Sequence, residues 1–374
     1  MLFSTYSHCH LLALGALVGS VRGTPVPETS YLKSRAVEDP EYFNQALPNI
    51  TIFATGGTIA GSAGSGDQTV GYTAGALNIS TLIEAVPQLR NSSNVRGVQI
   101  ANVDSGNINS TILTRLSHAI QEELNSPYVQ GAVVTHGTDT LEESSFFLDL
   151  TIQSEKPVVF VGSMRPATAL SADGPINLLS AVRLAGTESA KNRGTMIVLN
   201  DKIGSARYTI KTNANSLDTF KAEDQGFLGS FENIHPLFWY PASRPLGHYY
   251  FNISTSPITQ PLPQVDILYG HQEVDSELFQ AAIEAGAKGI VLAGVGAGGW
   301  PSEAVEELER VVNQTQIPVV ISRRTAWGFV TGQDFGINAG YLNPSKARIQ
   351  LQLALAKQLP LEEIRGIFEY NNVK

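Results

Sequence analysis

A hydroxyl group and a glycine turn come together in residues 49–61. Residues 50–54 alternate β-branched and apolar side chains, which is typical of a strand, and Gly56 and Gly57 then permit backbone angles that other residues avoid. The Thr58 hydroxyl would therefore stand at the end of a strand, where α/β folds usually place their chemistry. Thr58 is a candidate nucleophile. The alternative is a tight turn whose threonines only hydrogen bond to backbone amides.

A second polar turn follows a second buried strand. Residues 131–134 form a short apolar run, and the turn after it exposes Thr138 and Asp139 before the next helix. Asp139 could hold the ammonium group of a substrate; alternatively, it is an ordinary carboxylate at a helix start. Thr140 and Glu143 have the spacing of a capping box, so we expect Thr140 to be structural.

Three further side chains near these turns could take part in chemistry. Tyr72 lies just beyond residues 62–68, whose glycine and serine content is typical of a mobile surface loop. It is either a packing residue or a phenol that reaches a threonine hydroxyl. Lys211 is either solvated or drawn into a site, where a lysine can lose its proton and act as a base. His136 has no partner at a useful spacing, so we interpret it as a packed histidine of the turn.

The composition limits the classes of protein that fit. The chain has 374 residues, of which 43% are hydrophobic and 16% are charged, enough for two globular domains. Its formal net charge is -9 and it has no dense cluster of Lys and Arg, so we expect no nucleic-acid partner. A phosphate-binding loop is disfavoured because no Gly-Lys-Ser/Thr follows the glycines before Thr58. A small neutral or zwitterionic ligand fits better.

The N-terminus indicates the compartment. Residues 1–23 contain an apolar run followed by small residues, as in a secretory signal peptide, although no Lys or Arg precedes the run. The run is too short to span a bilayer. The single cysteine, Cys9, falls in this segment, so the mature chain would have neither disulfide nor thiol chemistry. We expect a secreted protein, extracellular or associated with the cell wall. Candidate N-glycosylation sequons begin at Asn49, Asn78, Asn91, Asn109, Asn252 and Asn313.

Strand and helix patterns alternate along the rest of the chain, which is typical of parallel sheets covered by helices. We predict an α/β protein with two flavodoxin-like parallel-sheet domains, a larger N-terminal domain in residues 47–240 and a smaller C-terminal domain in residues 265–374. Residues 241–264 contain five prolines and form the linker. Residues 24–46 form an N-terminal arm or pro-segment.

Several strands of this pattern are clear enough to place. In the larger domain, a strand at residues 196–199 is followed by an arm that leads to Lys211. In the smaller domain, the strands are expected at residues 265–269, 289–293 and 317–321.

The two strand-end turns lie within residues 54–61 and 135–143, and together these segments resemble the two signature motifs of the bacterial-type L-asparaginase family. The likeness runs from residue 47 to about residue 370. It continues through residues 147–151, 164–166, 171–175, 200–201, 211–213, 294–296 and 342–344. With the apparent signal peptide, it indicates the secreted, type II branch.

The resemblance implies a role for each matched residue. Thr58 corresponds to the nucleophilic threonine and Tyr72 to the tyrosine paired with it. Ser105 corresponds to the serine that binds the α-carboxylate of the substrate. The second triad corresponds to Thr138, Asp139 and Lys211, of which Thr138 and Asp139 also bind the substrate.

The resemblance also implies the reaction: hydrolysis of the side-chain amide of L-asparagine to L-aspartate and ammonia, through a covalent acyl-threonine. The Thr58 hydroxyl needs a base, which would be the Tyr72 phenol or, through Thr138, an unprotonated Lys211. This chemistry needs no metal and no organic cofactor. The family further implies a homotetramer of tight dimers with active sites shared between subunits, and neither a membrane nor a nucleic acid as partner.

Departures from the family pattern leave two other functions open. Gly106 stands where many secreted relatives carry a glutamine, Ala297 replaces an asparagine supplied by a neighbouring subunit, and residues 325–340 lack a clear counterpart of an intersubunit glutamate. One alternative is a glutaminase-asparaginase of broad specificity. The other is a secreted amino-acid-binding protein without turnover, although such a protein would need Asp139 and Ser105 but not Lys211.

Overall fold

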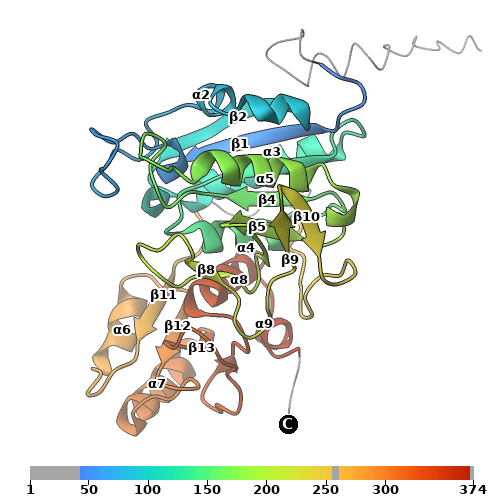
Figure 1. The fold of residues 1–374 in the computed structure, drawn as a ribbon. Coiled ribbons are helices and arrows are strands. Elements are labelled where there is room, and N and C mark those ends of the chain that lie inside the picture. The colour runs from blue at the N-terminus through green and yellow to red at the C-terminus, as the bar shows by residue number, and fades with distance from the viewer. Residues whose placement is uncertain (1–42, 255–260, 371–374) are drawn as a thin grey trace, which may run out of the picture.

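The structure, a computed structural model, describes residues 43–254 and 261–370. Figure 1 shows two α/β units, one formed by the N-terminal part of the chain and the other by the C-terminal part. The prediction of a two-domain α/β fold is therefore confirmed. The predicted signal peptide with Cys9 lies outside the described residues, as do residues 24–42 of the predicted arm and 255–260 of the predicted linker.

Eight strands form the larger sheet: β1 (Asn49–Gly56), β2 (Asn94–Val103), β3 (Gly131–Thr135), β4 (Val158–Val161), β5 (Thr195–Leu199), β6 (Lys202–Ser205), β9 (Gly229–Glu232) and β10 (His235–Phe238). Their order across the sheet is β10-β9-β6-β5-β4-β3-β1-β2. The strands β1 to β5 pair in parallel, and their order, 2-1-3-4-5, is that of flavodoxin-like sheets. The strand order reverses between β1 and β3, which are neighbours in the sheet.

The other three strands of this sheet are antiparallel, although the sequence predicted a parallel sheet. The strand β5 ends at Leu199, β6 begins at Lys202, and the two pair directly. Asn200 and Asp201 between them have φ angles of 50° and 58°, the left-handed backbone of a two-residue hairpin. The sequence predicted an arm after residue 199, but the chain turns back there instead. The strands β6, β9 and β10 then extend the sheet.

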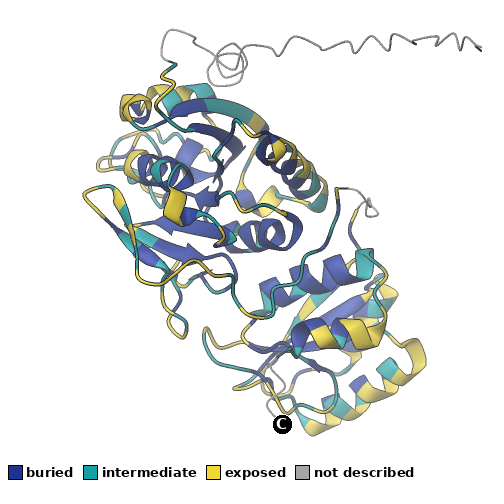
Figure 2. Cartoon of the chain, turned by 90° about the vertical axis from the view of Figure 1, so that its right-hand side faces the viewer, coloured by how far each residue is buried: buried dark blue, intermediate teal, exposed yellow. Residues whose placement is uncertain are grey.

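Helices cover both faces of the larger sheet. They are α2 (Ile79–Glu84), α3 (Ser110–Asn125), α4 (Leu141–Thr151) and α5 (Gly174–Ala185). The strand β1 is buried along its whole length, as expected of a central parallel strand. Its side chains alternate between two cores: Phe53 joins the core of α3 and α4, whereas Ile50 and Ile52 join the core of α2 and α5. Figure 2 shows buried strands in the interior and exposed residues on the outer helices.

The smaller sheet contains β11 (Val265–Tyr269), β12 (Gly289–Gly294), β13 (Val319–Arg323) and β14 (Ile337–Asn338). All pairs are parallel, and the three strands expected from the sequence are confirmed to within two residues. The strands follow one another in chain order, so this sheet has no reversal of strand order and differs in this detail from the predicted flavodoxin-like arrangement. The helices of this part are α6 (Glu277–Glu284), α7 (Ser302–Thr315), α8 (Pro344–Ala356) and α9 (Leu361–Phe368).

The helix α8 joins the two parts of the molecule. It packs against α4 of the larger part and against β11 and β12 of the smaller part. One continuous hydrophobic core includes Phe146 of α4, Leu353 of α8 and Val320 of β13. The smaller sheet is therefore attached to the larger part through a shared core. Among the described residues, none of the helices combines the length and apolar character that a membrane crossing requires.

Short elements between the strands and helices of the larger part complete the fold. They are the 3-10 turns η2 (Thr58–Ala60), η3 (Pro87–Asn91), η4 (Ser105–Asn107) and η5 (Glu188–Ala190) and the paired strands β7 (Ile210–Lys211) and β8 (Phe220–Lys221). The turn η2 directly follows β1, and η4 directly follows β2. The described residues of the predicted linker contain neither helix nor strand.

Candidate active site

A cleft of about 680 Å³ lies where β1 and β3 end. These two strands flank the point at which the strand order of the larger sheet reverses, which is where open α/β sheets bind ligands. All site residues predicted from the sequence line this one cleft: Thr58, Tyr72, Ser105, Thr138, Asp139 and Lys211. They come from five separate segments of the chain, so the fold brings together what the sequence separates.

Thr58 and Tyr72 form the first pair of the cleft. The Thr58 Oγ1 and the Tyr72 OH are 2.7 Å apart and share a hydrogen bond. Thr58 follows Gly57, whose φ of 80° and ψ of -170° lie in a region open essentially to glycine alone. The turn is also tight, because a Cβ on Gly57 would lie 2.2 Å from the backbone of Gly137. Two glycine turns therefore press against each other and aim the Thr58 hydroxyl into the cleft.

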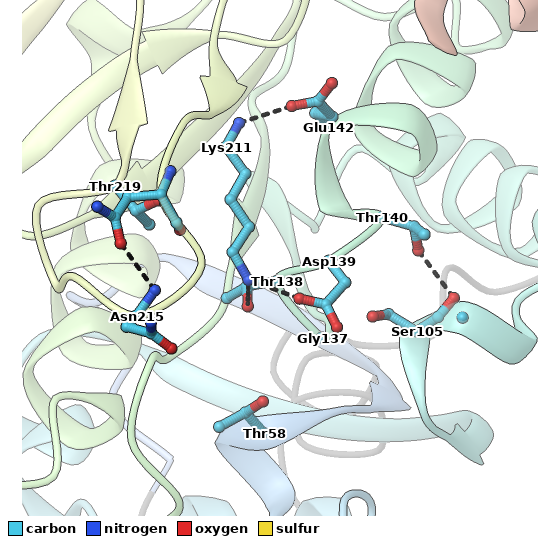
Figure 3. A network of polar contacts seen from close by, with 12 residues as sticks. Thr58, Ser105, Gly137, Thr138, Asp139, Thr140, Glu142, Lys211, Asn215 and Thr219 are labelled. Carbon is cyan, nitrogen blue, oxygen red and sulfur yellow. Dashed lines mark hydrogen bonds and ion pairs between the residues drawn. The ribbon is translucent and has the colours of Figure 1, made fainter. Parts of the chain in front are cut away.

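Lys211 forms the second cluster with Thr138 and Asp139. Its Nζ donates to Thr138 Oγ1 at 3.0 Å and to Asp139 Oδ1 at 2.5 Å. In Figure 3 these three side chains meet across the cleft from Thr58. The Lys211 side chain is mostly buried, with 13% of it exposed, whereas the Asp139 side chain is 69% exposed. Lys211 is thus drawn into the site, and the solvated alternative for it is wrong.

The sequence predicted that Thr138 and Asp139 are both exposed, and this is correct for Asp139 only. Asp139 is exposed as predicted, but Thr138 is 4% exposed and hence buried. Gly162 packs closely against Thr138, because a Cβ at Gly162 would lie 3.0 Å from Thr138 Cγ2. Thr138 still lines the cleft, so burial fixes its hydroxyl in place without removing it from the site.

Thr140 does not form the predicted capping box. It precedes α4 as expected, but its side chain makes no hydrogen bond to the amides of that helix. The hydroxyl donates instead to the backbone oxygen of Ser105 at 2.8 Å. Thr140 is therefore structural in another way, because it ties the turn after β3 to the turn after β2. Ser105 is 4% exposed and lines the cleft between these turns.

His136 is a packed histidine, as predicted. It is fully buried, and its Nδ1 donates to the backbone oxygen of Gly137 at 2.7 Å, which places a proton on Nδ1. Burial lowers the pKa of His136 to about 4, although the hydrogen bond to Gly137 opposes this shift. His136 is not among the residues that line the cleft.

Several cleft residues were not predicted. Thr69 and Val70 line it from the loop before Tyr72, Met164 and Arg165 from the turn after β4, and residues 214–217 from the loop between β7 and β8. Glu142 supports the site from behind, because its Oε2 accepts a hydrogen bond from the Lys211 backbone N–H at 2.6 Å. No local signal marks Glu142, since acids are common in the first turn of any helix.

The positions that depart from the family pattern lie outside this chain's cleft. Gly106 follows Ser105 but is not part of the cleft wall, and Ala297 lies in the loop after β12. Within residues 43–254 and 261–370, no group of three or more His, Cys, Asp or Glu side chains is placed to hold a metal ion.

Comparison with known proteins identifies the family. Residues 49–243 match the domain family described as "Asparaginase, N-terminal", and residues 264–368 match the "Glutaminase/Asparaginase C-terminal domain". The chain belongs to the bacterial-type L-asparaginase family. The two matched domains of this asparaginase-family chain contain the larger and the smaller sheet of the structure, respectively.

Relatives of this asparaginase-family chain come from fungi and bacteria. It is 48% identical over 336 residues to "Probable L-asparaginase 3" of Schizosaccharomyces pombe, covering 90% of this chain and 92% of the relative. It is 48% identical over 339 residues to "L-asparaginase 2" of Bacillus subtilis, covering 86% of each. A solved structure, named as a probable cytoplasmic L-asparaginase from Campylobacter jejuni, aligns with a TM-score of 0.81 at 43% identity, covering 86% of this chain and 99% of that one.

Proposed function

We propose that this protein is an L-asparaginase, an amidohydrolase that converts the side-chain amide of L-asparagine into L-aspartate and ammonia. The observation that carries the proposal is the meeting of two polar clusters in one cleft: Thr58 with Tyr72, and Lys211 with Thr138 and Asp139. A hydroxyl within hydrogen-bond distance of a base candidate is the arrangement that an acyl-transfer nucleophile requires.

The reaction proceeds in two steps. The Thr58 Oγ1 attacks the amide carbon of the substrate while its proton passes to the Tyr72 oxygen at 2.7 Å, and the phenol passes its own proton on toward the amide nitrogen. The amide nitrogen takes up a proton and leaves as ammonia, which leaves an ester between the substrate acyl group and Thr58. Water then attacks this ester, releases aspartate and restores the hydroxyl. Backbone amides of the strand-end turns are the donors for the oxyanion, each typically worth about 3–4 kcal/mol.

Lys211 and Thr138 serve the other side of the substrate amide, and Asp139 lies beside them. Lys211 Nζ contacts both Thr138 Oγ1 and Asp139 Oδ1, so the lysine and the Thr138 hydroxyl lie within hydrogen-bond distance of each other in the cleft. We assign the exposed Asp139 carboxylate to the α-ammonium group of the substrate and Ser105 to its α-carboxylate. These contacts would hold the amide carbon within about 3 Å of the nucleophile, an effect that can supply several kcal/mol of the barrier reduction.

The alternative within enzymes is a glutaminase-asparaginase of broad specificity. Gly106 and Ala297 depart from the family pattern, and neither position lies in the cleft wall of this chain. A binding protein without turnover is the alternative outside enzymes. The buried contact of Lys211 with Thr138 argues against that reading, because binding a zwitterion requires no lysine at a threonine hydroxyl.

The test is ammonia release from L-asparagine and from L-glutamine by the purified chain that begins at residue 24. We expect Thr58→Ala to lose activity on asparagine by about 10⁴-fold or more, as removal of a nucleophile typically does. Thr58→Ser, which keeps a hydroxyl, should retain measurable turnover. Circular dichroism is the check that both variants are folded. A fully active Thr58→Ala would reject the nucleophile, and a wild-type chain inactive on both amides would favour the binding protein.

The covalent intermediate can be located directly. An acid-quenched reaction, digested and examined by mass spectrometry, should carry the aspartyl group on the peptide that contains Thr58. The acyl group on the peptide that contains Thr138 would instead assign the attack to the second threonine, with Lys211 as its base.

We further propose that the protein belongs to the secreted, type II branch and is glycosylated. The composition of residues 1–23 and the six sequons support this proposal. Asn49 is buried and bonded to Tyr128 and Asn94, which makes it unsuitable for a glycan, whereas four other sequon asparagines are exposed: Asn78, Asn91, Asn109 and Asn313. Detection of the protein in the growth medium tests secretion, and a loss of mass on glycosidase treatment tests glycosylation.

We also propose a homotetramer with active sites shared between subunits. The first support is the family resemblance. The second is that Ala297 lies outside the chain's own cleft, so the loop that carries it would contact the active site of a neighbouring subunit. Light scattering after size-exclusion chromatography should report four chains per particle. A monomeric and fully active enzyme would reject the shared site.

A further inference from the structure

Glu142 lies behind the cleft and connects Lys211 with the smaller domain. It lies in the first turn of α4, four residues after Thr138, and it is 8% exposed. Its carboxylate accepts two short hydrogen bonds: Oε2 from the Lys211 backbone N–H at 2.6 Å, and Oε1 from Asn343 Nδ2 at 2.7 Å. Figure 3 shows the first of these contacts at the upper end of the lysine.

Lys211 is held at both of its ends by one short segment. Thr138 and Asp139 contact its Nζ, and Glu142 contacts its backbone N–H. The strand β7 itself has only two residues and pairs with an equally short β8, which leaves it few contacts of its own. The position of the lysine therefore depends on the first turn of α4, which directly follows the catalytic turn.

The smaller domain fixes the orientation of Glu142. Asn343 is the N-cap of α8, and its Oδ1 accepts from the Lys346 backbone N–H at 3.1 Å. Because Oδ1 is used in this way, Nδ2 is the atom that faces Glu142. Lys346, which is 1% exposed, donates through Nζ to the backbone oxygens of Arg207 at 3.1 Å and Thr209 at 2.7 Å. The start of α8 thus also hydrogen bonds to the backbone of the residues just before Lys211.

We propose that Glu142 is a positioning residue for Lys211, and that Asn343 of the smaller domain sets the direction of the Glu142 carboxylate. The lysine Nζ then sits at Thr138 because the start of α8 and the start of α4 are linked through Glu142. This inference rests on the proposed function, in which Lys211 acts on the substrate amide. The competing explanation is that the link only stabilises the contact between the two domains.

The chemistry of the link supplies a rescue experiment. Glu142→Gln keeps one acceptor for the Lys211 N–H but turns its new amide group toward Asn343 Nδ2, so two donors face each other. Asn343→Asp keeps the cap on Lys346 but places a second carboxylate against Glu142. In the double variant the introduced amide at 142 donates to the introduced carboxylate at 343, and every donor again has an acceptor.

We expect each single variant to lower kcat by about 10- to 100-fold at a temperature well below its unfolding midpoint, as misplacement of a reacting group typically does. KM should change by less than about threefold, because neither residue contacts the substrate. The double variant should recover most of kcat. Glu143→Gln is the matched control: this next residue of the same turn faces Arg348 at 3.8 Å and lies outside the cleft, so kcat should stay at the wild-type value.

Two further variants make the outcome decisive. Asn343→Ser keeps a capping hydroxyl and removes only the donor to Glu142, so it serves if Asn343→Asp does not fold. Lys211→Met reports the role of the lysine itself. If Lys211→Met is inactive while Glu142→Gln and Asn343→Ser keep wild-type kcat, the link is only structural and the inference is overturned. A wild-type chain that hydrolyses neither amide, or an active Lys211→Met, would overturn the proposed role of the lysine and the inference with it.

Discussion

At the scale of single residues, His136 connects the site to the stability of the fold. It sits fully buried between the strand β3 and the catalytic turn, in the neutral form, with its Nδ1 proton on the Gly137 oxygen. Its pKa is lowered from 6.5 to about 4 by burial. Between these two pH values the unfolded chain binds a proton at this residue and the folded chain does not, so folding stability falls as the pH falls.

We expect the free energy of unfolding to drop by about 2 kcal/mol more between pH 7 and 5 in the wild-type chain than in His136→Gln, from 1.36 kcal/mol per pKa unit. The glutamine keeps a donor for the Gly137 oxygen and cannot titrate. Urea unfolding at the two pH values measures the difference. Equal pH dependence in both proteins would mean that His136 does not control this part of the acid response.

At the scale of elements, the site depends on two glycine turns that touch. The turn after β1 and the turn after β3 approach so closely that a Cβ on Gly57 would lie 2.2 Å from the Gly137 backbone, and Gly57 also has a φ of 80°. Gly57→Ala should therefore lower the free energy of unfolding by about 3–5 kcal/mol, from overpacking and backbone strain together. It should also abolish turnover, because the Thr58 hydroxyl moves with the turn.

Gly226→Ala separates the two causes. Gly226 also has a positive φ, 74°, but no atom lies within 4 Å of the position that a Cβ would take. We expect it to cost only about 1–2 kcal/mol, the penalty of the left-handed backbone alone, and to leave kcat unchanged. Denaturant unfolding of both variants gives the comparison. Similar losses in the two variants would show that the close approach of the turns contributes little.

At the scale of the whole molecule, the two sheets share one core. The helix α8 packs against α4 on one side and against β11 and β12 on the other, and Leu353 of this helix is fully buried in the shared core. We expect the chain to unfold in a single transition rather than domain by domain. Leu353→Ala should lower the free energy of unfolding by about 2–5 kcal/mol, the usual cost of such a cavity.

Two signals test this cooperativity. Far-ultraviolet circular dichroism follows the whole chain, whereas two of its three tryptophans, Trp300 and Trp327, lie in the smaller part and dominate the fluorescence change of that part. Coincident transitions that move together in Leu353→Ala support one folding unit. A fluorescence transition that separates from the circular dichroism transition would mean that the smaller part unfolds by itself.

The strands, the helices and the two strand-end turns could be predicted from the sequence, because the patterns that specify them are local. A buried run such as residues 131–134, a pair of glycines before Thr58 and an apolar period of helical spacing all act within about one element. The predicted site residues also line one cleft, because parallel strands end at the same edge of a sheet. The resemblance to a family then supplied their roles.

Only the tertiary structure decided how these pieces are held. The hairpin at Asn200 and Asp201 adds antiparallel strands because both residues adopt left-handed backbone, which many asparagines and aspartates do not. Lys211 meets Thr138 across 73 positions, and Glu142 meets Asn343 across 201. The second of these contacts depends on the packing of α8 against both parts of the molecule, and no local pattern encodes that packing. The sequence by itself determined which groups could do chemistry, and the fold decided which of them are close enough to do it.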